Sequence, residues 1–366
     1  MAKILFISTI KINDFDNFLG DISRKLSKQH EIWRYSILDC TLTDYSSGKE
    51  IIFSNSSSNF AMLKSIFKLK SNLKDVDYIH YHFINFYVVL VHILIFKYYN
   101  AIKYATFWGS DFAIANKKNY LLGIFFKGMN KIIFSNKVSL NSFSEIYPNL
   151  KNNLGIVKWP LGQLELQKNI VKVDRDIFEF DVPKGKQIVC VGTNGGKNQN
   201  HLKIIDELSK LNLAITENFF FLFPIGYPRN NEIYISEILS KLKESSLPHY
   251  QLDYTFHENT SLAHYRKMTD VMIQVQNNDM FSGAMQEAIF GGAKIITGSW
   301  LPYDILDDNN VLFFKIKDFS EMCSVFIRAI NYEISNLEKQ HNAEVIYSLS
   351  GWGAIKEQWF GLYKNG

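Results

Sequence analysis

Apolar segments of strand length alternate with segments of helical periodicity along the chain, and this alternation limits the folds available to it. In the first half, Phe18, Leu19, Ile22 and Leu26 recur at helical spacing and predict a helix over 16–29. The strand-like segments of this half are Lys3–Ser8, Tyr78–Phe83, Lys103–Phe107, Lys131–Ser135 and Gly155–Trp159, with an apolar helix expected at 86–99. Strands that alternate with helices favour a parallel sheet covered on both faces.

A second series of the same kind follows the charged segment 167–185, which contains Pro183 and is a candidate linker. Its predicted strands are Gln187–Gly192, Phe219–Pro224, Tyr250–Phe256, Val271–Val275 and Lys294–Thr297, and its predicted helices are His201–Lys210, Asn231–Glu244, Ser261–Met268 and Ser282–Phe290. We therefore predict an α/β protein with two Rossmann-like, doubly wound domains at 1–165 and 166–349 that face a cleft. A C-terminal helix at 350–366 is expected to cross back towards the first domain.

Composition and charge narrow the functional classes. Hydrophobic residues make up 47% of the 366 residues, enough for two ordinary cores. The longest apolar run, Phe86–Phe96, has 11 residues, whereas a membrane-spanning helix needs about 20. The first residues are too few and too soon polar for a signal peptide. The three cysteines are widely spaced and form neither a metal motif nor a disulfide framework, as expected in a reducing cytoplasm.

The net charge of +4 conceals an asymmetry. Residues 1–160 contain 20 Lys/Arg and 11 Asp/Glu, whereas residues 161–366 contain 20 and 25. A basic half indicates an anionic partner such as lipid head groups. The segment 63–74 and the aromatic-rich segment 117–137 both carry several lysines, so they are candidates for an anionic membrane surface or for solvated helix faces. The basic residues are otherwise scattered and no reading module is visible, so nucleic acid is not an expected partner.

A glycine-rich turn follows the strand at 187–192. Gly192 and Thr193 open it, Lys197 follows, and Asn200 precedes the next helix. Backbone N–H groups in such a turn and the N-terminus of a helix both attract anions, and the lysine would neutralise a diphosphate. The same pattern is also compatible with an ordinary turn and a surface lysine.

A second turn precedes the helix at 282–290. Ser282, Gly283 and Ala284 stand where this helix begins, so a phosphate can approach its free N–H groups. Glu287 lies on the first turns and would accept hydrogen bonds from sugar hydroxyls, and Asp279 precedes it by eight positions. A plain helix with a Ser cap and a Gly stop is the alternative.

Two further groups stand at strand ends in the first half. Asp111, in the sequence Phe107-Trp108-Gly109-Ser110-Asp111, is a candidate general base on an acceptor hydroxyl, or an N-cap. Trp108 and Ser110 would contact an acceptor sugar. His80 and His82 share one strand face and are acceptor-site candidates, although a core histidine is the alternative for at least one of them.

No metal and no other cofactor is expected. The acidic triplets Asp75-Val76-Asp77 and Asp174-Arg175-Asp176 are interpreted as chance patterns, since a lysine and helix N-termini would hold a diphosphate without a cation.

Taken together, these segments resemble the bacterial 4-acetamido-4,6-dideoxygalactose transferases, which are related to 4-alpha-L-fucosyltransferases, and they share features with the retaining glycosyltransferases of the GT-B fold. The segment 224–235 is similar to that family's Gly-Tyr-Pro-x-Asn-Asn-Glu-x-Tyr-Ile stretch, as are 191–201 and 107–111 to two others. The resemblance implies that Tyr227, Asn230 and Glu232 shape a nucleotide pocket. It also implies a cytoplasmic enzyme on the inner face of the membrane that extends a lipid-diphosphate-linked saccharide.

The chain departs from that family at Glu287, whose eight-residue spacing from Asp279 is instead similar to the paired acids of the retaining GT-B enzymes. Trp108 stands where those enzymes often carry His, and the first strand lacks their paired glycines. The expected function is transfer of a sugar from a thymidine- or uridine-diphosphate sugar to a saccharide acceptor of O-antigen, capsule or common-antigen type. A sugar-nucleotide 2-epimerase on the same fold and a non-catalytic carbohydrate-binding protein are the alternatives.

Overall fold

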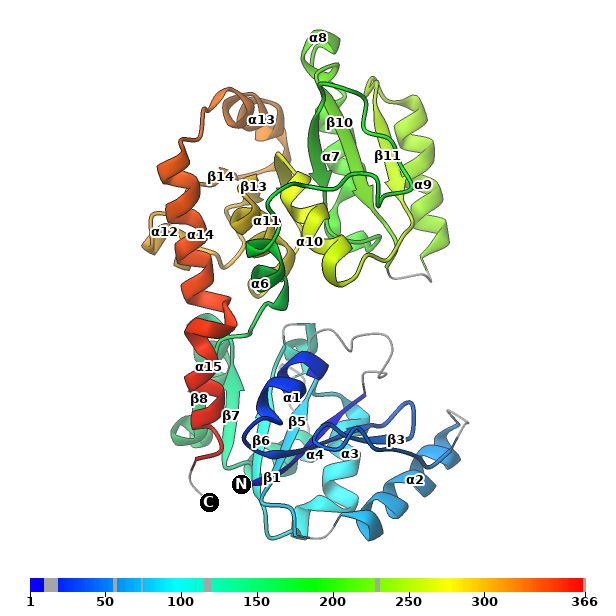
Figure 1. The fold of residues 1–366 in the computed structure, drawn as a ribbon, viewed down its shortest axis with the longest axis vertical. Helices are drawn as coiled ribbons and strands as arrows, with labels where there is room; N and C mark the ends of the chain where they lie inside the picture. The colour runs from blue at the N-terminus through cyan, green and yellow to red at the C-terminus, as the bar shows by residue number, and fades with distance from the viewer. Residues whose placement is uncertain are drawn as a thin grey trace. The chain divides into compact units, whose positions relative to one another are not determined.

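The computed structural model describes residues 1–9, 19–54, 58–73, 75–108, 110–114, 120–227 and 231–364. The chain forms two compact units (Figure 1). Unit 1 comprises Met1–Pro160 together with Gly353–Gly366, and unit 2 comprises Leu161–Trp352. No helix among the described residues is both long and apolar enough to span a membrane.

The described part of unit 1 is built on an eight-stranded sheet with the order β4-β3-β2-β1-β5-β6-β7-β8. Its strands are β1 (Lys3–Ser8), β2 (Glu31–Ser36), β3 (Thr41–Asp44), β4 (Glu50–Ile52), β5 (Tyr78–His82), β6 (Ile102–Thr106), β7 (Lys131–Phe134) and β8 (Leu154–Ile156). The strands from β2 through β1 to β8 are parallel, and β3 and β4 add an antiparallel edge. Four consecutive residues of β1, Ile4–Ile7, are fully buried, as expected for a strand covered on both faces.

Helices cover both faces of this sheet. They are α1 (Asp21–Leu26), α2 (Asn59–Asn72), α3 (Phe86–Leu94), α4 (Tyr120–Lys127), α5 (Lys137–Ile146) and α15 (Trp352–Gly361), with short 3₁₀ turns η2 (Phe96–Tyr98), η3 (Ser110–Ile114) and η4 (Pro148–Asn153). Buried residues of α2, α3, α4 and α5 join one core cluster with β1, β2, β5 and β6. The last helix belongs to unit 1 although it is distant in sequence: the hydroxyl of Tyr363 pairs with His80, and Trp359 donates to the carbonyl of Lys158.

The described part of unit 2 has a six-stranded parallel sheet with the order β11-β10-β9-β12-β13-β14. Its strands are β9 (Gln187–Val191), β10 (Phe219–Pro224), β11 (Tyr250–Asp253), β12 (Val271–Gln274), β13 (Lys294–Gly298) and β14 (Phe314–Ile316). Its helices are α6 (Gly162–Lys168), α7 (His201–Leu208), α8 (Leu213–Thr216), α9 (Glu232–Glu244), α10 (Asn259–Met268), α11 (Gly283–Gly291), α12 (Asp304–Asp308), α13 (Met322–Asn331) and α14 (Asn336–Ser350), with 3₁₀ turns η5 (Lys197–Gln199) and η6 (Phe319–Glu321). Residues of α7, α9 and α13 form one core cluster with the sheet.

The predicted doubly wound α/β class is confirmed, and most predicted strands of unit 2 match within two residues. Several predictions need correction. The helix expected at 86–99 ends at Leu94 and continues as a 3₁₀ turn, because Ile95 leaves helical geometry. The strands β2, β3, β4 and β14 were not predicted, and the linker candidate at 167–185 begins inside α6.

Candidate functional site

Each sheet has one position where the strand order reverses, and in unit 2 this position lies between β9 and β12. The two strands pair in parallel, with Val191 opposite Ile273, so their carboxyl ends lie side by side. In open α/β sheets, ligands bind outside the carboxyl ends of the strands at such a reversal. The two turns that the sequence singled out follow these two strands.

Hydrogen bonds tie the two turns together. Asn198 accepts from the N–H of Asn277 at 3.0 Å and donates to the carbonyl of Asn278 at 3.1 Å. The side-chain amide of Gln199 donates to Gln276 at 2.7 Å. Asn200 donates to the carbonyl of Val275 and to Asn277, both at 2.9 Å.

Asn200 is therefore a structural residue in this structure and not an open ligand contact. It takes a left-handed conformation before α7, with φ 59°, and is almost completely buried. Gln199 and Gln276 were not among the predicted site residues, since their pairing depends on β9 lying beside β12, a strand about 80 residues later in the sequence.

Several backbone N–H groups of the glycine-rich turn donate hydrogen bonds to acceptors within the protein. Gly192 donates to the carbonyl of Ile273 at 2.9 Å, and Thr193 donates to Gln199 at 3.1 Å. Gly195 and Gly196 likewise donate to the carbonyl of Tyr227 and to the side chain of Asn194. The expectation that the N–H groups of Gly192 and Thr193 cradle a phosphate is thus wrong for this structure, because both already have acceptors within the protein.

Gly192 is required by the shape of this turn. Its φ of +71° is in the left-handed region, and an added Cβ would lie 2.7 Å from Nε2 of His201. Neither ring nitrogen of His201 has a hydrogen-bond partner in the part of the chain that the structure describes, and burial lowers the pKa of this histidine to about 4. The neutral ring of His201 packs directly against Gly192 and so leaves no room for a side chain there.

Replacing Gly192 by alanine is expected to lower the free energy of unfolding by about 1–2 kcal/mol for the left-handed backbone, with a further loss from the contact with His201. Gly185→Ala is the matched control, because Gly185 has a similar φ of +82° but nothing within 4 Å of an added Cβ. Urea denaturation of the two variants measures the difference. Equal destabilisation of both would contradict the proposed support by His201.

Lys197 is the cation of this region. It begins η5, its side chain is exposed, and its Nζ lies 5.7 Å from the ring centroid of Tyr234. A lysine at the carboxyl end of β9, next to the strand reversal, is accessible to a soluble anion.

The second turn places a helix N-terminus at the same reversal. Ser282 is the N-cap of α11: its Oγ accepts from the N–H of Met285 at 3.2 Å and from Gln274 at 2.9 Å. The preceding N–H groups, those of Gly283 and Ala284, have no acceptor within the helix, as in the first turn of any helix. Ser282 thus positions the helix end, and Gly283 and Ala284 present its free N–H groups.

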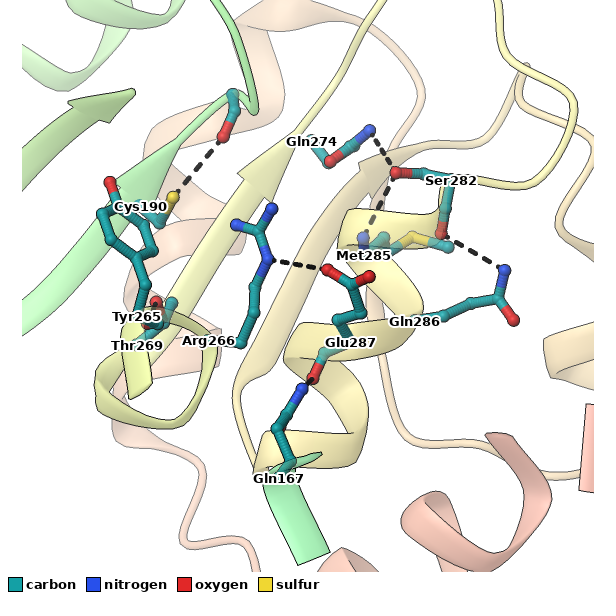
Figure 2. A network of polar contacts seen from close by, with 11 residues as sticks. Gln167, Cys190, Tyr265, Arg266, Thr269, Gln274, Ser282, Met285, Gln286 and Glu287 are labelled. Carbon is teal, nitrogen blue, oxygen red and sulfur yellow. Dashed lines mark hydrogen bonds and ion pairs between the residues drawn. The ribbon is translucent and has the colours of Figure 1, made fainter. Parts of the chain in front are cut away.

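Glu287 lies in a buried ion pair. Its Oε2 accepts from Nε of Arg266 on α10 at 3.1 Å, and the two residues are 7% and 6% exposed (Figure 2). Burial raises the pKa of Glu287, while Arg266 opposes the rise. The backbone carbonyl of Glu287 accepts from Gln167 at 3.1 Å. The sequence contained no signal for Arg266, because two residues that are 21 positions apart meet only when α10 packs on α11.

Figure 2 also shows Gln274 at the end of β12 with its amide directed at Ser282. The side-chain oxygen of Gln274, Oε1, is buried and has no hydrogen-bond partner among the described residues. A buried acceptor without a donor is costly, so this atom is one point where a bound polar group would be stabilised.

Asp279 is held by its own loop. Its carboxylate accepts a hydrogen bond from the hydroxyl of Tyr303, and burial raises the pKa of Asp279. Backbone groups of Met280 and Ser282 and the side chain of Gln276 also bond to it. These contacts shape the loop before α11.

The structure describes part of the segment 224–235, which is similar to a family motif. Asn230 lies outside the described residues. Tyr227 is 48% exposed beside Phe256, and Glu232 is exposed on the first turn of α9. Asn231 donates to the carbonyl of Gly195 at 2.9 Å, which fixes this segment against the glycine-rich turn.

In unit 1 the strand order reverses between β1 and β5, and His82 ends β5 there. Its Nδ1 accepts from the indole N–H of Trp108 at 3.1 Å, and its Nε2 has no hydrogen-bond partner within the described ranges. Burial holds the pKa of His82 well below its usual range, with His80 and Arg34 adding to the effect. The neutral imidazole of His82 therefore lies at the carboxyl end of β5, next to the strand reversal.

His80 does not fit the expected acceptor role. Its two nitrogens pair with Tyr363 and Thr106, both at 2.6 Å, and burial lowers its pKa to about 3. It is a core histidine under α15, which was the alternative that the sequence left open.

Asp111 and Trp108 are also engaged within unit 1. Asp111 accepts from the N–H groups of Ile84 and Trp108, at 2.9 and 2.8 Å, and so joins the loops after β5 and β6. The rings of Phe83 and Trp159 already stack on Trp108, with centroids 4.9 and 4.5 Å away. The contacts of Asp111 are those of a structural carboxylate. The side chain of Ser110 is not among those that the structure describes.

The acidic triplets have structural contacts. Asp77 accepts from the N–H of Lys3 at 2.7 Å, and Asp174 accepts from the N–H of Asp176 at 3.0 Å. Within the described ranges, no group of three or more His, Cys, Asp or Glu residues is arranged to hold a metal ion.

The chain is similar to solved structures over its full length. A glycosyltransferase from Rickettsia africae has a TM-score of 0.76 at 15% identity, covering 100% of this chain and 99% of that one. Sucrose-phosphate synthase from Thermosynechococcus elongatus has a TM-score of 0.73 at 11% identity, covering 99% and 98%. HepE of Anabaena, solved with UDP and glucose, has a TM-score of 0.71 at 11% identity, covering 99% of both chains.

At these identities the likeness shows the fold, which is the GT-B fold of glycosyltransferases. The expected fold class is thus confirmed. No protein-family model and no curated protein sequence matches the chain.

Proposed function

We propose that the protein is a glycosyltransferase whose unit 2 binds the nucleotide diphosphate of a sugar donor. The observation that carries the proposal is the strand reversal between β9 and β12, where Lys197 and the N-terminus of α11 follow adjacent strands. A cation and free helix N–H groups are what a diphosphate requires. The structural neighbour HepE was solved with UDP and glucose, which supports this choice of ligand.

In this proposal, the diphosphate is the leaving group of the transfer reaction. Lys197 and the N–H groups of Gly283 and Ala284 would stabilise the negative charge that develops on it. No metal ion is needed for this role, because the protein supplies the positive charge. Tyr227, Asn230 and Glu232 would shape the pocket for the base and the ribose.

The buried pair changes the role proposed for Glu287. Since Glu287 already binds Arg266, we propose that it is a positioning residue, which sets the first turns of α11 against α10. Gln274, which is almost completely buried and donates to Ser282, would likewise hold the N-cap of α11 in place.

We propose that unit 1 binds a saccharide acceptor, lipid-linked or part of a surface polysaccharide. His82, which ends β5 at the strand reversal between β1 and β5, is fully buried and would support that site from within the core. Asp111, with both carboxylate oxygens bonded to backbone N–H groups, would keep the loops of that site in place.

A thermal-shift screen of the purified chain against UDP, TDP and GDP tests the donor site. A nucleotide present at a hundred times its Kd stabilises the folded state by about 2.7 kcal/mol, which is a rise in Tm of several degrees for a unit of this size. UDP or TDP is expected to give this shift, whereas uridine and thymidine, which lack the diphosphate, are expected to give little or none. No shift with any nucleoside diphosphate would contradict the proposal.

A further inference from the structure

Helix α2 is apolar on two opposite faces. Met62, Ile66 and Leu69 are buried in the core of unit 1. On the outer face, Phe60, Leu63 and Phe67 are 77%, 38% and 61% exposed. Their spacing of three and four residues places them on one stripe of the helix. Two exposed phenylalanines on one surface stripe are unusual for a helix that meets only water.

The neighbouring helices present side chains of the same kind. Because α2, α3 and α4 all bury their inner side chains in one core cluster, they lie on the same face of the sheet and turn their outer sides to solvent there. The exposed apolar residues of α3 and α4 are Phe86, Tyr87, Leu94, Tyr120 and Leu121. We call the outer surface of these three helices the aromatic face.

The charge of this face has one sign. The three helices of this face contain four lysines, three on α2 and one on α4. Lys64 and Lys68 are exposed and flank Phe67 and Leu63 on α2, and Lys97 and Lys127 are exposed after α3 and at the end of α4. Helices α2, α3 and α4 themselves contain no Asp or Glu.

We propose that the aromatic face docks on the surface of an anionic lipid bilayer. Exposed Phe and Leu side chains flanked by lysines suit the boundary between head groups and acyl chains, where the rings enter the apolar layer and the ammonium groups meet phosphate. α2 has 14 residues, so it is about 21 Å long and would lie in the interface.

Charge argues against a second copy of the chain as the occupant. A two-fold interface brings the same patch of both subunits together, so lysines would face lysines, and helices α2, α3 and α4 supply no carboxylate to pair with them. An anionic bilayer supplies the opposite charge. None of these residues belongs to the proposed donor site, so the inference can hold or fail independently of the transferase proposal.

Sedimentation of the full chain with vesicles tests this docking. The chain is expected to bind vesicles of phosphatidylcholine mixed with phosphatidylglycerol and to bind vesicles of phosphatidylcholine alone much more weakly. The double variant Phe60→Ser/Phe67→Ser is expected to lower the partition coefficient at least about tenfold, since two rings no longer enter the apolar layer. Lys64→Gln/Lys68→Gln is expected to lower it by about fivefold or more for each charge removed, an effect that high salt abolishes.

Ile233→Ser/Leu337→Ser is the matched control. These residues are 78% and 80% exposed but lie in unit 2, so vesicle binding is expected to stay unchanged. The proposal is overturned if the wild-type chain does not prefer anionic vesicles, or if the control reduces binding as much as the phenylalanine variant. It is also overturned if light scattering finds a wild-type dimer that the phenylalanine variant dissociates and no vesicle binding is seen.

Discussion

Glu287→Ala is expected to lower the free energy of unfolding by about 3–5 kcal/mol, because it leaves the guanidinium of Arg266 buried without its carboxylate. Both partners are almost completely excluded from solvent, so water cannot replace the lost partner. Urea denaturation followed by tryptophan fluorescence and circular dichroism measures the loss. A substitution by alanine therefore tests stability before it tests catalysis.

A variant that removes both charges separates the effect of charge from that of packing. Arg266→Met/Glu287→Leu removes both charges and keeps apolar volume, and such replacements of buried pairs are often neutral or stabilising. The double variant is thus expected to be more stable than Glu287→Ala alone. If Glu287→Ala unfolds at the wild-type urea concentration, the pair is not buried in solution as described.

Lys197→Ala is expected to weaken the binding of UDP or TDP by about 10- to 100-fold, the loss of one charge-assisted contact with the diphosphate. The side chain is exposed and its nearest aromatic contact is the ring of Tyr234, so the folded state should keep its stability. Isothermal titration gives the affinity, and a thermal melt without nucleotide gives the stability.

Lys203→Ala is the control for this experiment. Lys203 is an exposed lysine on α7, only six positions later, and its Nζ lies 5.0 Å from the ring centroid of Phe319. It therefore shares the charge, the unit and an aromatic neighbour with Lys197 but does not lie at the strand reversal. Equal loss of affinity in the two variants would mean that Lys197 acts only through the net charge of unit 2.

The features that could be predicted from the sequence are those that depend on neighbouring residues. The strand β10 is a run of phenylalanines that ends at Pro224, and Ser282 followed by Gly283 marks a helix start. Both were found because periodicity and capping are local properties. The same local reasoning missed β3 and β4, which are four and three residues long and have weak apolar patterns, and it also missed the six-residue strand β2.

The residues that could not be predicted owe their positions to contacts between distant segments. Arg266 meets Glu287 through the packing of α10 on α11, and Gln199 meets Gln276 because β9 pairs with β12. The glycine-rich turn shows the opposite error: its composition is that of a phosphate-binding loop, but the N–H groups of Gly192, Thr193, Gly195 and Gly196 already have acceptors within the protein. Composition indicates which atoms are present, and only the fold shows which of them remain free.

A crystal structure of the full chain with UDP would show whether a nucleotide diphosphate binds at the strand reversal of unit 2. Diphosphate oxygens are expected about 2.7–3.1 Å from Nζ of Lys197 and from the first N–H groups of α11. A structure in which UDP binds elsewhere in the chain, or in which its diphosphate touches neither group, would contradict the proposed donor site.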